Sequence, residues 1–101
     1  MALHAQTFPF TAKLIAVAPE HGGVYALWLD GSLIYLGHAR GGASTIRSRL
    51  VDHYSGMVGV CSRRASHYSW EIAANPAARE RELLEEYLRA HERAPRCNER
   101  P

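Results

Sequence analysis

The stretch "GVYALWLDGSLIYLG", residues 23–37, has the pattern of a β-hairpin. Aliphatic and aromatic residues, which favour strands, occupy both ends of the stretch. Between them stands Asp30-Gly31, a dipeptide that favours a tight turn between antiparallel strands. The pattern predicts strands at 23–29 and 32–37, with a tyrosine in each.

The length of the hairpin loop decides how the two tyrosines are placed. With a two-residue loop, Tyr25 and Tyr35 would point to opposite faces of the sheet, because side chains alternate along a strand. With a three-residue loop, Leu29-Asp30-Gly31, they would lie directly opposite each other on one face. Glycine adopts the left-handed conformation that the third position of such a loop requires. We therefore expect the three-residue loop.

Outward from the hairpin, the chain shows the patterns of three helices and one further strand. Ile46, Leu50 and Tyr54 form an apolar stripe with helical spacing. Asn75-Pro76 is a typical helix start, with a capping residue followed by proline. The expected elements are a short helix capped by Thr11 and ended by Pro19, a helix from a cap at Ser44 to Gly56, a strand in "HYSWEIA" (67–73), and a helix from Pro76 to about Arg93.

Length and composition are those of one small globular domain. The chain has 101 residues, of which 47% are hydrophobic, enough for a single modest core. We expect one domain over residues 1–101. No apolar run approaches the roughly 20 residues that a membrane-spanning helix needs. The N-terminus lacks the basic and apolar regions of a secretory leader, so we expect a cytoplasmic protein.

The two cysteines do not form a disulfide framework by number or spacing. In a chain without a leader, we interpret Cys61 and Cys97 as free thiols of a reducing cytoplasm. A zinc site made of these cysteines with His67 and His91 is a weaker interpretation, because the spacings are irregular and no CxxC motif occurs.

Charge is unevenly distributed along the chain, although the net charge is only +2. Residues 38–64 contain five arginines and one aspartate, whereas residues 71–92 contain six glutamates and three arginines. A basic segment suits a phosphate-bearing partner, to which arginine binds with two parallel hydrogen bonds. Two solvated faces of opposite charge would explain the same distribution.

Several polar residues fall on faces that are otherwise apolar. Arg49 and His53 lie four residues apart on a strip beside the apolar stripe of their helix. Glu80 lies on the inward side of the last helix, where a carboxylate needs a cation, a metal or hydrogen-bond donors. Taken singly, each has an ordinary structural explanation: Arg49 can pair with Asp52 or Glu80, and His53 can be a satisfied core histidine.

Taken together, these residues resemble the GIY-YIG nuclease family in their order and spacing, over about residues 20–99. Val24 and Leu36 stand where the family motifs have isoleucine, and the interval between Glu80 and Asn98 is longer than expected. The matching segments are Gly23-Val24-Tyr25, Tyr35-Leu36-Gly37, Arg49-Leu50 with His53, Glu80 with Leu83 and Leu84, and Pro95 with Asn98.

The resemblance implies an α/β (α+β) fold with a three-stranded, mostly antiparallel sheet flanked by helices. It implies a DNA endonuclease that uses one divalent metal, Mg²⁺ or Mn²⁺, held by Glu80. Arg49 would stabilise charge on the phosphate in the transition state, and Tyr25 would orient or deprotonate the attacking water. The implied catalytic set is Tyr25, Tyr35, Arg49, His53, Glu80 and Asn98.

Alternatives remain at this stage. Glu82 is a rival for Glu80 as metal ligand, and Glu80 is preferred for its face. A nucleic-acid-binding or interaction module with weak catalysis is the alternative to an enzyme, since a fold does not determine a function. A binding domain stabilised by zinc is a third hypothesis. The sequence does not name the DNA substrate, which could be branched or nicked, nor a protein partner that supplies specificity.

Overall fold

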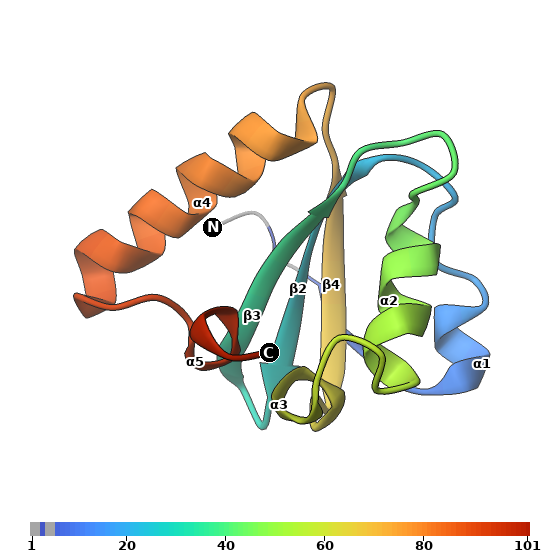
Figure 1. Ribbon diagram of the computed structural model, residues 1–101, viewed down its shortest axis with the longest axis horizontal. Helices are drawn as coiled ribbons and strands as arrows, with labels where there is room; N and C mark the ends of the chain where they lie inside the picture. The colour runs from blue at the N-terminus through green and yellow to red at the C-terminus, as the bar shows by residue number, and fades with distance from the viewer. Residues whose placement is uncertain (1–2, 4–5) are drawn as a thin grey trace.

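An antiparallel sheet with strand order β1-β4-β2-β3 runs through the middle of the molecule (Figure 1). The computed structural model describes Leu3 and residues 6–101. Four of the first five residues, on which the expectation of no leader partly rests, lie outside the described residues. The strands are β1 (Phe8–Pro9), β2 (Gly23–Leu29), β3 (Ser32–Ala39) and β4 (His67–Ile72).

The sheet has four strands where three were predicted. The additional strand, β1, is only two residues long and pairs with β4 through Phe8↔Tyr68 and Pro9↔His67. The rings of Phe8 and Tyr68 are 5.5 Å apart. A strand of two residues is too short to show the alternation by which strands are predicted. It forms because the edge of β4 offers backbone groups to pair with. The predicted α+β class with an antiparallel sheet is confirmed.

Helices cover both faces of the sheet. In Figure 1, α1 and α2 lie on one side of the strands and α4 lies on the other, while α3 and α5 lie near one end. The helices are α1 (Ala12–Ile15), α2 (Ile46–Tyr54), α3 (Val60–Arg63), α4 (Pro76–His91) and α5 (Arg96–Glu99).

Helix starts follow the expected capping chemistry with one shift. The side chain of Thr11 caps α1, and the side chain of Asn75 accepts a hydrogen bond from the backbone N–H of Ala78 in α4. The predicted cap of α2 at Ser44 is wrong by one residue. Thr45 is the cap, and with Ser48 it forms a reciprocal capping box.

The hairpin loop has two residues, not the predicted three. Leu29 pairs with Ser32, and Asp30 and Gly31 both have positive φ, 49° and 88°. Two central residues with positive φ make the turn type that matches strand twist in two-residue hairpins. The expectation that Leu29 belongs to the loop is therefore wrong.

The two tyrosines nevertheless share one face, because a bulge in β3 restores the alternation. The register shifts between Leu27 and Trp28, so that Leu27 pairs with Tyr35 while Trp28 pairs with Leu33, and Ile34 is the extra residue. Tyr25 then pairs with Gly37 rather than with Tyr35. The extra residue that we expected in the turn lies inside the strand.

Two apolar clusters form the core, one on each face of the sheet. On the face of α1 and α2, the cluster contains Tyr25, Leu27, Ile46 and Leu50 among its buried residues. On the face of α4, a second cluster contains Val24, Ala26, Leu36 and Leu83. Both clusters draw on β2, which is therefore buried on both faces. No helix in the described part of the chain is long and apolar enough to cross a membrane.

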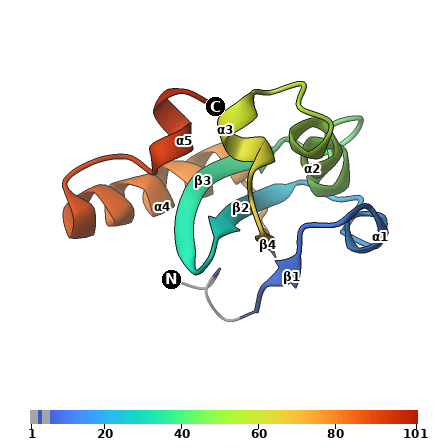
Figure 2. The same cartoon turned by 90° about the horizontal axis from the view of Figure 1, so that it is seen from below.

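Cys61 and Cys97 form a disulfide bond between α3 and α5, with a Cα–Cα distance of 5.6 Å. The prediction of free thiols is wrong, and a zinc site that uses both thiols is wrong with it. Within the described residues, no group of three or more His, Cys, Asp or Glu could hold a metal ion. The cysteines are 36 residues apart in the sequence, so only the packing of α3 beside α5 (Figure 2) brings them together.

Candidate active site

Tyr25, Tyr35 and His53 meet on the sheet face that α2 covers. The centroids of the two tyrosine rings are 6.2 Å apart, and the ring planes are inclined at 30°. The imidazole of His53 lies edge-on to both rings, 5.5 Å from Tyr25 and 4.6 Å from Tyr35. The Tyr25 hydroxyl and Nε2 of His53 are 2.8 Å apart and hydrogen-bonded. Three residues that are distant in sequence thus form one aromatic and polar cluster.

Two glycines of the hairpin allow this close packing. A Cβ on Gly37 would lie 2.6 Å from the Tyr25 hydroxyl oxygen, because the Tyr25 ring covers this position of β3. A Cβ on Gly23 would lie 2.4 Å from the backbone oxygen of Glu71 and 2.9 Å from the Ile46 side chain. Both glycines are thus required by the space their neighbours leave, since contacts under 3 Å would force a shift.

His53 is a buried link between Tyr25 and a residue that the sequence did not indicate. Its Nδ1 is 2.7 Å from the hydroxyl of Ser62, and both side chains are fully buried. Burial, with the nearby positive charge of Arg49, lowers the pKa of His53 to about 4. His53 is therefore neutral near pH 7, so that one ring nitrogen donates a hydrogen bond and the other accepts one.

The Tyr25 hydroxyl is held in its protonated form. Its pKa is raised well above the usual range, first by burial and then by the neighbouring Tyr35 hydroxyl, while Arg49 lowers it in part. The pKa of Tyr35 is raised as well, by burial, against the effect of Arg49. The cation that a tyrosine needs to act as a phenolate is present, but burial outweighs it.

Arg49 lies beside both tyrosines and is only partly buried. Its Nη1 donates a hydrogen bond to Oδ2 of Asp52, one turn further along α2, at 3.0 Å. Of the two carboxylates considered from sequence, Asp52 is thus the partner. About a third of the Arg49 side chain is exposed, so the guanidinium group can meet an anion that approaches from solvent.

Glu80 reaches the site from α4, on the other side of the sheet. Its Oε1 is 2.8 Å from Nδ1 of His38, and 23% of its side chain is exposed. The charge of Glu80 contributes to the raised pKa values of Tyr25 and Tyr35, so it acts on the tyrosines although α4 packs on the opposite face. This is feasible because β3 is an edge strand.

Glu82, the rival carboxylate, points elsewhere. Its side chain is 67% exposed and pairs with Arg79 at 3.3 Å. Arg79 also holds Glu71 of β4 through two hydrogen bonds, at 2.6 and 3.2 Å, which attaches the start of α4 to the sheet. Its interactions therefore place Glu82 with the structural ion pairs of α4.

Asn98 lies at the free edge of β3, with both ends of its amide on the backbone of Leu36. The Leu36 N–H donates to Oδ1 of Asn98 at 2.9 Å, and Nδ2 of Asn98 donates to the Leu36 carbonyl at 2.8 Å. Leu36 stands between Tyr35 and Gly37. Asn98 therefore supports the backbone between Tyr35 and Gly37. These hydrogen bonds use its side chain away from the cluster of Tyr25 and His53.

Sequence reasoning missed His38 and Ser62. His38 follows Gly37 directly and shares a face of β3 with Leu36, so strand alternation toward the inward Glu80 could have indicated it. Ser62 lies in the short helix α3, and nothing local indicated that it would reach His53. Its role depends on the packing of α3 against α2.

The site combines the partly exposed guanidinium group of Arg49, the carboxylate of Glu80 and a buried chain of hydrogen bonds from Tyr25 through His53 to Ser62. Glu80 fits a hard divalent cation, because a single carboxylate suffices for Mg²⁺, which keeps several of its waters. Its Oε1 is oriented by His38, in the manner of outer residues that orient metal ligands. Arg49 suits a phosphate. The arrangement can thus bind a phosphodiester beside a metal and move a proton.

Among solved structures, the chain is similar to an enzyme domain. That domain is the GIY-YIG N-terminal endonuclease domain of UvrC from Thermotoga maritima, solved as an asparagine-to-alanine point mutant with its catalytic divalent cation bound. The TM-score is 0.60 at 26% sequence identity, covering 74% of this chain and 86% of that chain. No protein-family profile and no curated protein sequence matches this chain. The similarity supports a nuclease-like function, and the protein has the fold of the GIY-YIG endonuclease domains.

Proposed function

We propose that the protein is a divalent-metal-dependent endonuclease that hydrolyses phosphodiester bonds in DNA. The observation that carries the proposal is the cluster of Tyr25, Tyr35, Arg49, His53 and Glu80 on a fold shared with an endonuclease domain. Each of these side chains has a chemical task that its surroundings support.

The proton path begins at the attacking water and runs through Tyr25. With its hydrogen on Nδ1, neutral His53 donates to Ser62 and its Nε2 accepts the hydroxyl hydrogen of Tyr25. Tyr25 can then take a proton from water while it passes its own to Nε2 of His53, which is an imidazolium only during the step and neutral at rest. The raised pKa of Tyr25 fits this relay, because no resting phenolate is needed.

Arg49 and Tyr35 act on the phosphate and on the water. The guanidinium group of Arg49 stabilises negative charge that develops on the phosphate oxygens, and it is already fixed by Asp52. The hydroxyl of Tyr35, whose ring packs against His53, orients the water or a phosphate oxygen. A divalent cation held by Glu80, Mg²⁺ or Mn²⁺, would neutralise charge on the phosphate and on the leaving oxygen.

The test is cleavage of supercoiled plasmid and of a labelled branched DNA, in magnesium, manganese or EDTA. The variants are Glu80→Ala and Arg49→Ala, with Glu82→Ala as the matched control on the same helix. We expect metal-dependent cutting by wild type and by Glu82→Ala, and a loss of at least about 100-fold in the other two, as for groups that stabilise a transition state.

Circular dichroism of each variant separates loss of chemistry from loss of fold. DNA binding by the wild-type protein without cutting of either substrate would contradict the nuclease and favour a binding module. Loss of cutting in Glu82→Ala with full activity in Glu80→Ala would contradict the assignment of the metal ligand.

A further inference from the structure

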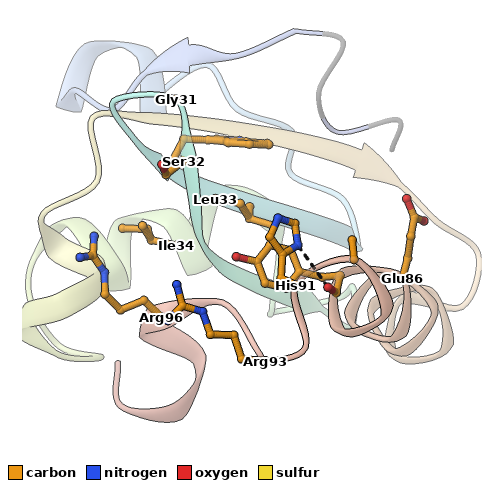
Figure 3. Close-up of a pocket in the computed structure, with 11 residues that line it drawn as sticks. Gly31, Ser32, Leu33, Ile34, Glu86, His91, Arg93 and Arg96 are labelled. Carbon is orange, nitrogen blue, oxygen red and sulfur yellow. Dashed lines mark hydrogen bonds between the residues drawn. The ribbon is translucent and has the colours of Figure 1, made fainter.

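A cavity of about 520 Å³ lies outside the candidate active site, between the hairpin end of β3, the last turns of α4 and the start of α5. Figure 3 shows Arg93 and Arg96 on one side of this cavity and Glu86 on the other. Leu33 and Ile34 of β3 form part of its floor. The volume falls within the range of small-molecule and nucleotide-sized sites.

The cavity combines aromatic rings with cations. The rings of Tyr87 and His91 are stacked, with their centroids 4.0 Å apart and their planes at 14°. The indole of Trp28 also lines the space. Flat aromatic surfaces of this kind bind nucleic-acid bases by stacking, without regard to sequence.

The two arginines are available for a ligand. Among the residues that the structure describes, neither the guanidinium group of Arg93 nor that of Arg96 has a hydrogen-bond or ion-pair partner. Both side chains belong to exposed residues. Guanidinium groups suit phosphate oxygens, to which they donate two parallel hydrogen bonds. The charge at this cavity therefore favours an anion.

The position of the cavity relates it to the active site. Ile34, which lines it, directly precedes Tyr35 in β3. At about 3.3 Å per residue, Ser32 lies roughly 16 Å along the strand from Gly37, a distance that about five stacked nucleotides of one strand would span. Because α2 and α4 cover opposite faces of the sheet, a DNA strand that contacts both places passes around the edge strand β3.

We propose that this cavity, the β3–α4 cavity, binds a nucleotide of an unpaired DNA strand, with its base against Tyr87 and His91 and its phosphates on Arg93 and Arg96. The inference rests on the proposed nuclease function and gives it a substrate class: DNA with a single-stranded segment beside the cut. A base inside a continuous duplex is stacked and paired, and cannot enter a cavity of this kind without leaving its partner.

The test measures binding apart from cutting. Fluorescence anisotropy in EDTA measures the binding of labelled (dT)20 and of a labelled 20-base-pair duplex. The proteins are wild type, a cavity variant with Arg93→Glu and Arg96→Glu, and a control variant with Arg81→Glu and Arg89→Glu. The control makes the same charge change at exposed positions of α4 outside the cavity. We expect the cavity variant to bind (dT)20 at least about 10-fold more weakly, as for loss of two phosphate contacts, and the control to change it by less than about 3-fold.

A second probe reports the aromatic contact. The chain has two tryptophans, so Trp70→Phe leaves Trp28, in the cavity, as the single indole fluorophore. We expect (dT)20 to change its emission, and Tyr87→Ala to weaken (dT)20 binding by about 5-fold or more, as for loss of a stacked base. The mononucleotide dTMP is the comparison ligand, and we expect it to bind far more weakly than (dT)20.

Each outcome decides between the proposals. Equal losses in the cavity variant and the control, or dTMP binding as tight as that of (dT)20, would overturn the strand as ligand of this cavity. Plasmid cutting by a protein whose cavity variants bind (dT)20 normally would overturn the cavity proposal and leave the nuclease intact. Cavity-dependent binding of (dT)20 without cutting of any DNA would support the cavity and overturn the nuclease.

Discussion

His53 is a buried histidine whose two ring nitrogens both have hydrogen-bond partners, Tyr25 and Ser62. The cost of placing a charge there is what keeps it neutral. Its neutrality matters for the proposed relay, because a protonated imidazole has no lone pair to accept the hydrogen of Tyr25. The same neutrality has a consequence for stability that is measurable without any substrate.

His53 makes the free energy of unfolding depend on pH. The pKa of His53 is lowered from its ordinary value of 6.5 to about 4 in the folded protein, so between these values the unfolded chain binds a proton that the folded chain does not. The free energy of unfolding therefore falls as pH falls from about 6.5 to 4, by an amount on the order of 3 kcal/mol. Urea unfolding of wild type and His53→Gln across this range measures the difference.

The variant supplies the control, because all other titrating groups are common to both proteins. A wild-type protein whose free energy of unfolding tracks that of His53→Gln from pH 7 to 4 would contradict the lowered pKa. At fixed pH near 7, His53→Gln is expected to lose cleavage as well, since an amide cannot take the proton from Tyr25.

At the scale of elements, α5 is a four-residue helix that depends on its contact with β3. The edge of a sheet presents unpaired N–H and C=O groups that must be satisfied or covered. Asn98 satisfies those of Leu36 with a pair of hydrogen bonds at 2.9 and 2.8 Å. The Asn98 side chain therefore attaches the C-terminal segment to the backbone of Leu36, between Tyr35 and Gly37.

Asn98→Ala is expected to destabilise the protein by about 1–3 kcal/mol, because two backbone groups of a half-buried edge lose their partners. Asn98→Asp keeps the acceptor for the Leu36 N–H but sets a carboxylate oxygen against the Leu36 carbonyl, so it is expected to destabilise the protein while keeping the N–H hydrogen bond. Amide hydrogen exchange measures this directly: the Leu36 N–H should exchange faster in Asn98→Ala than in Asn98→Asp. Unchanged protection of Leu36 in both variants would rule out this role.

The hairpin has both predicted strands, but its loop and register differ from the prediction. Alternation and Asp30-Gly31 indicated both strands, and the placement of Tyr25 and Tyr35 on one face is confirmed by their ring contact. The reason given for it was wrong, because the extra residue is Ile34 in the strand rather than Leu29 in the loop. Turn chemistry is local, but a bulge depends on how β3 packs against β2.

At the scale of the molecule, the Cys61–Cys97 disulfide joins the two segments that support the site. Cys61 precedes Ser62, which holds His53, and Cys97 precedes Asn98, which holds Leu36. The bond closes α3 onto α5 across 36 residues of sequence. The disulfide thus connects the segment that contacts His53, through Ser62, with the segment that contacts Leu36, through Asn98.

Removal of this bond, by Cys61→Ser with Cys97→Ser or by a reducing agent, is expected to lower the free energy of unfolding by about 4 kcal/mol. This is the loss of chain entropy expected for a loop of this length. Denaturant unfolding of the oxidised and reduced wild-type protein measures it, and the double variant should match the reduced form. Identical transitions with and without reductant would show that the bond contributes nothing.

Local sequence patterns were enough to predict most helices and strands and the order of the chemical groups along the chain. Asn75-Pro76 indicated the start of α4, and the alternating residues 67–72 indicated β4. The fold was implied by the resemblance of Tyr25, Tyr35, Arg49, His53 and Glu80 to the GIY-YIG family. The signals for α4 and β4 depend on residues close together in sequence, through capping and side-chain periodicity.

The contacts between distant segments depend on how the whole chain packs. They include the strand β1 on the edge of β4, the pairing of Cys61 with Cys97, and the contacts of Ser62 with His53 and of His38 with Glu80. Apart from His38, whose face on β3 follows from strand alternation, none of these residues has a local signature, because each contact forms where the packing of two elements brings a polar or edge group within reach. A partner for a buried polar group is obligatory, but its identity depends on the packing of the whole chain.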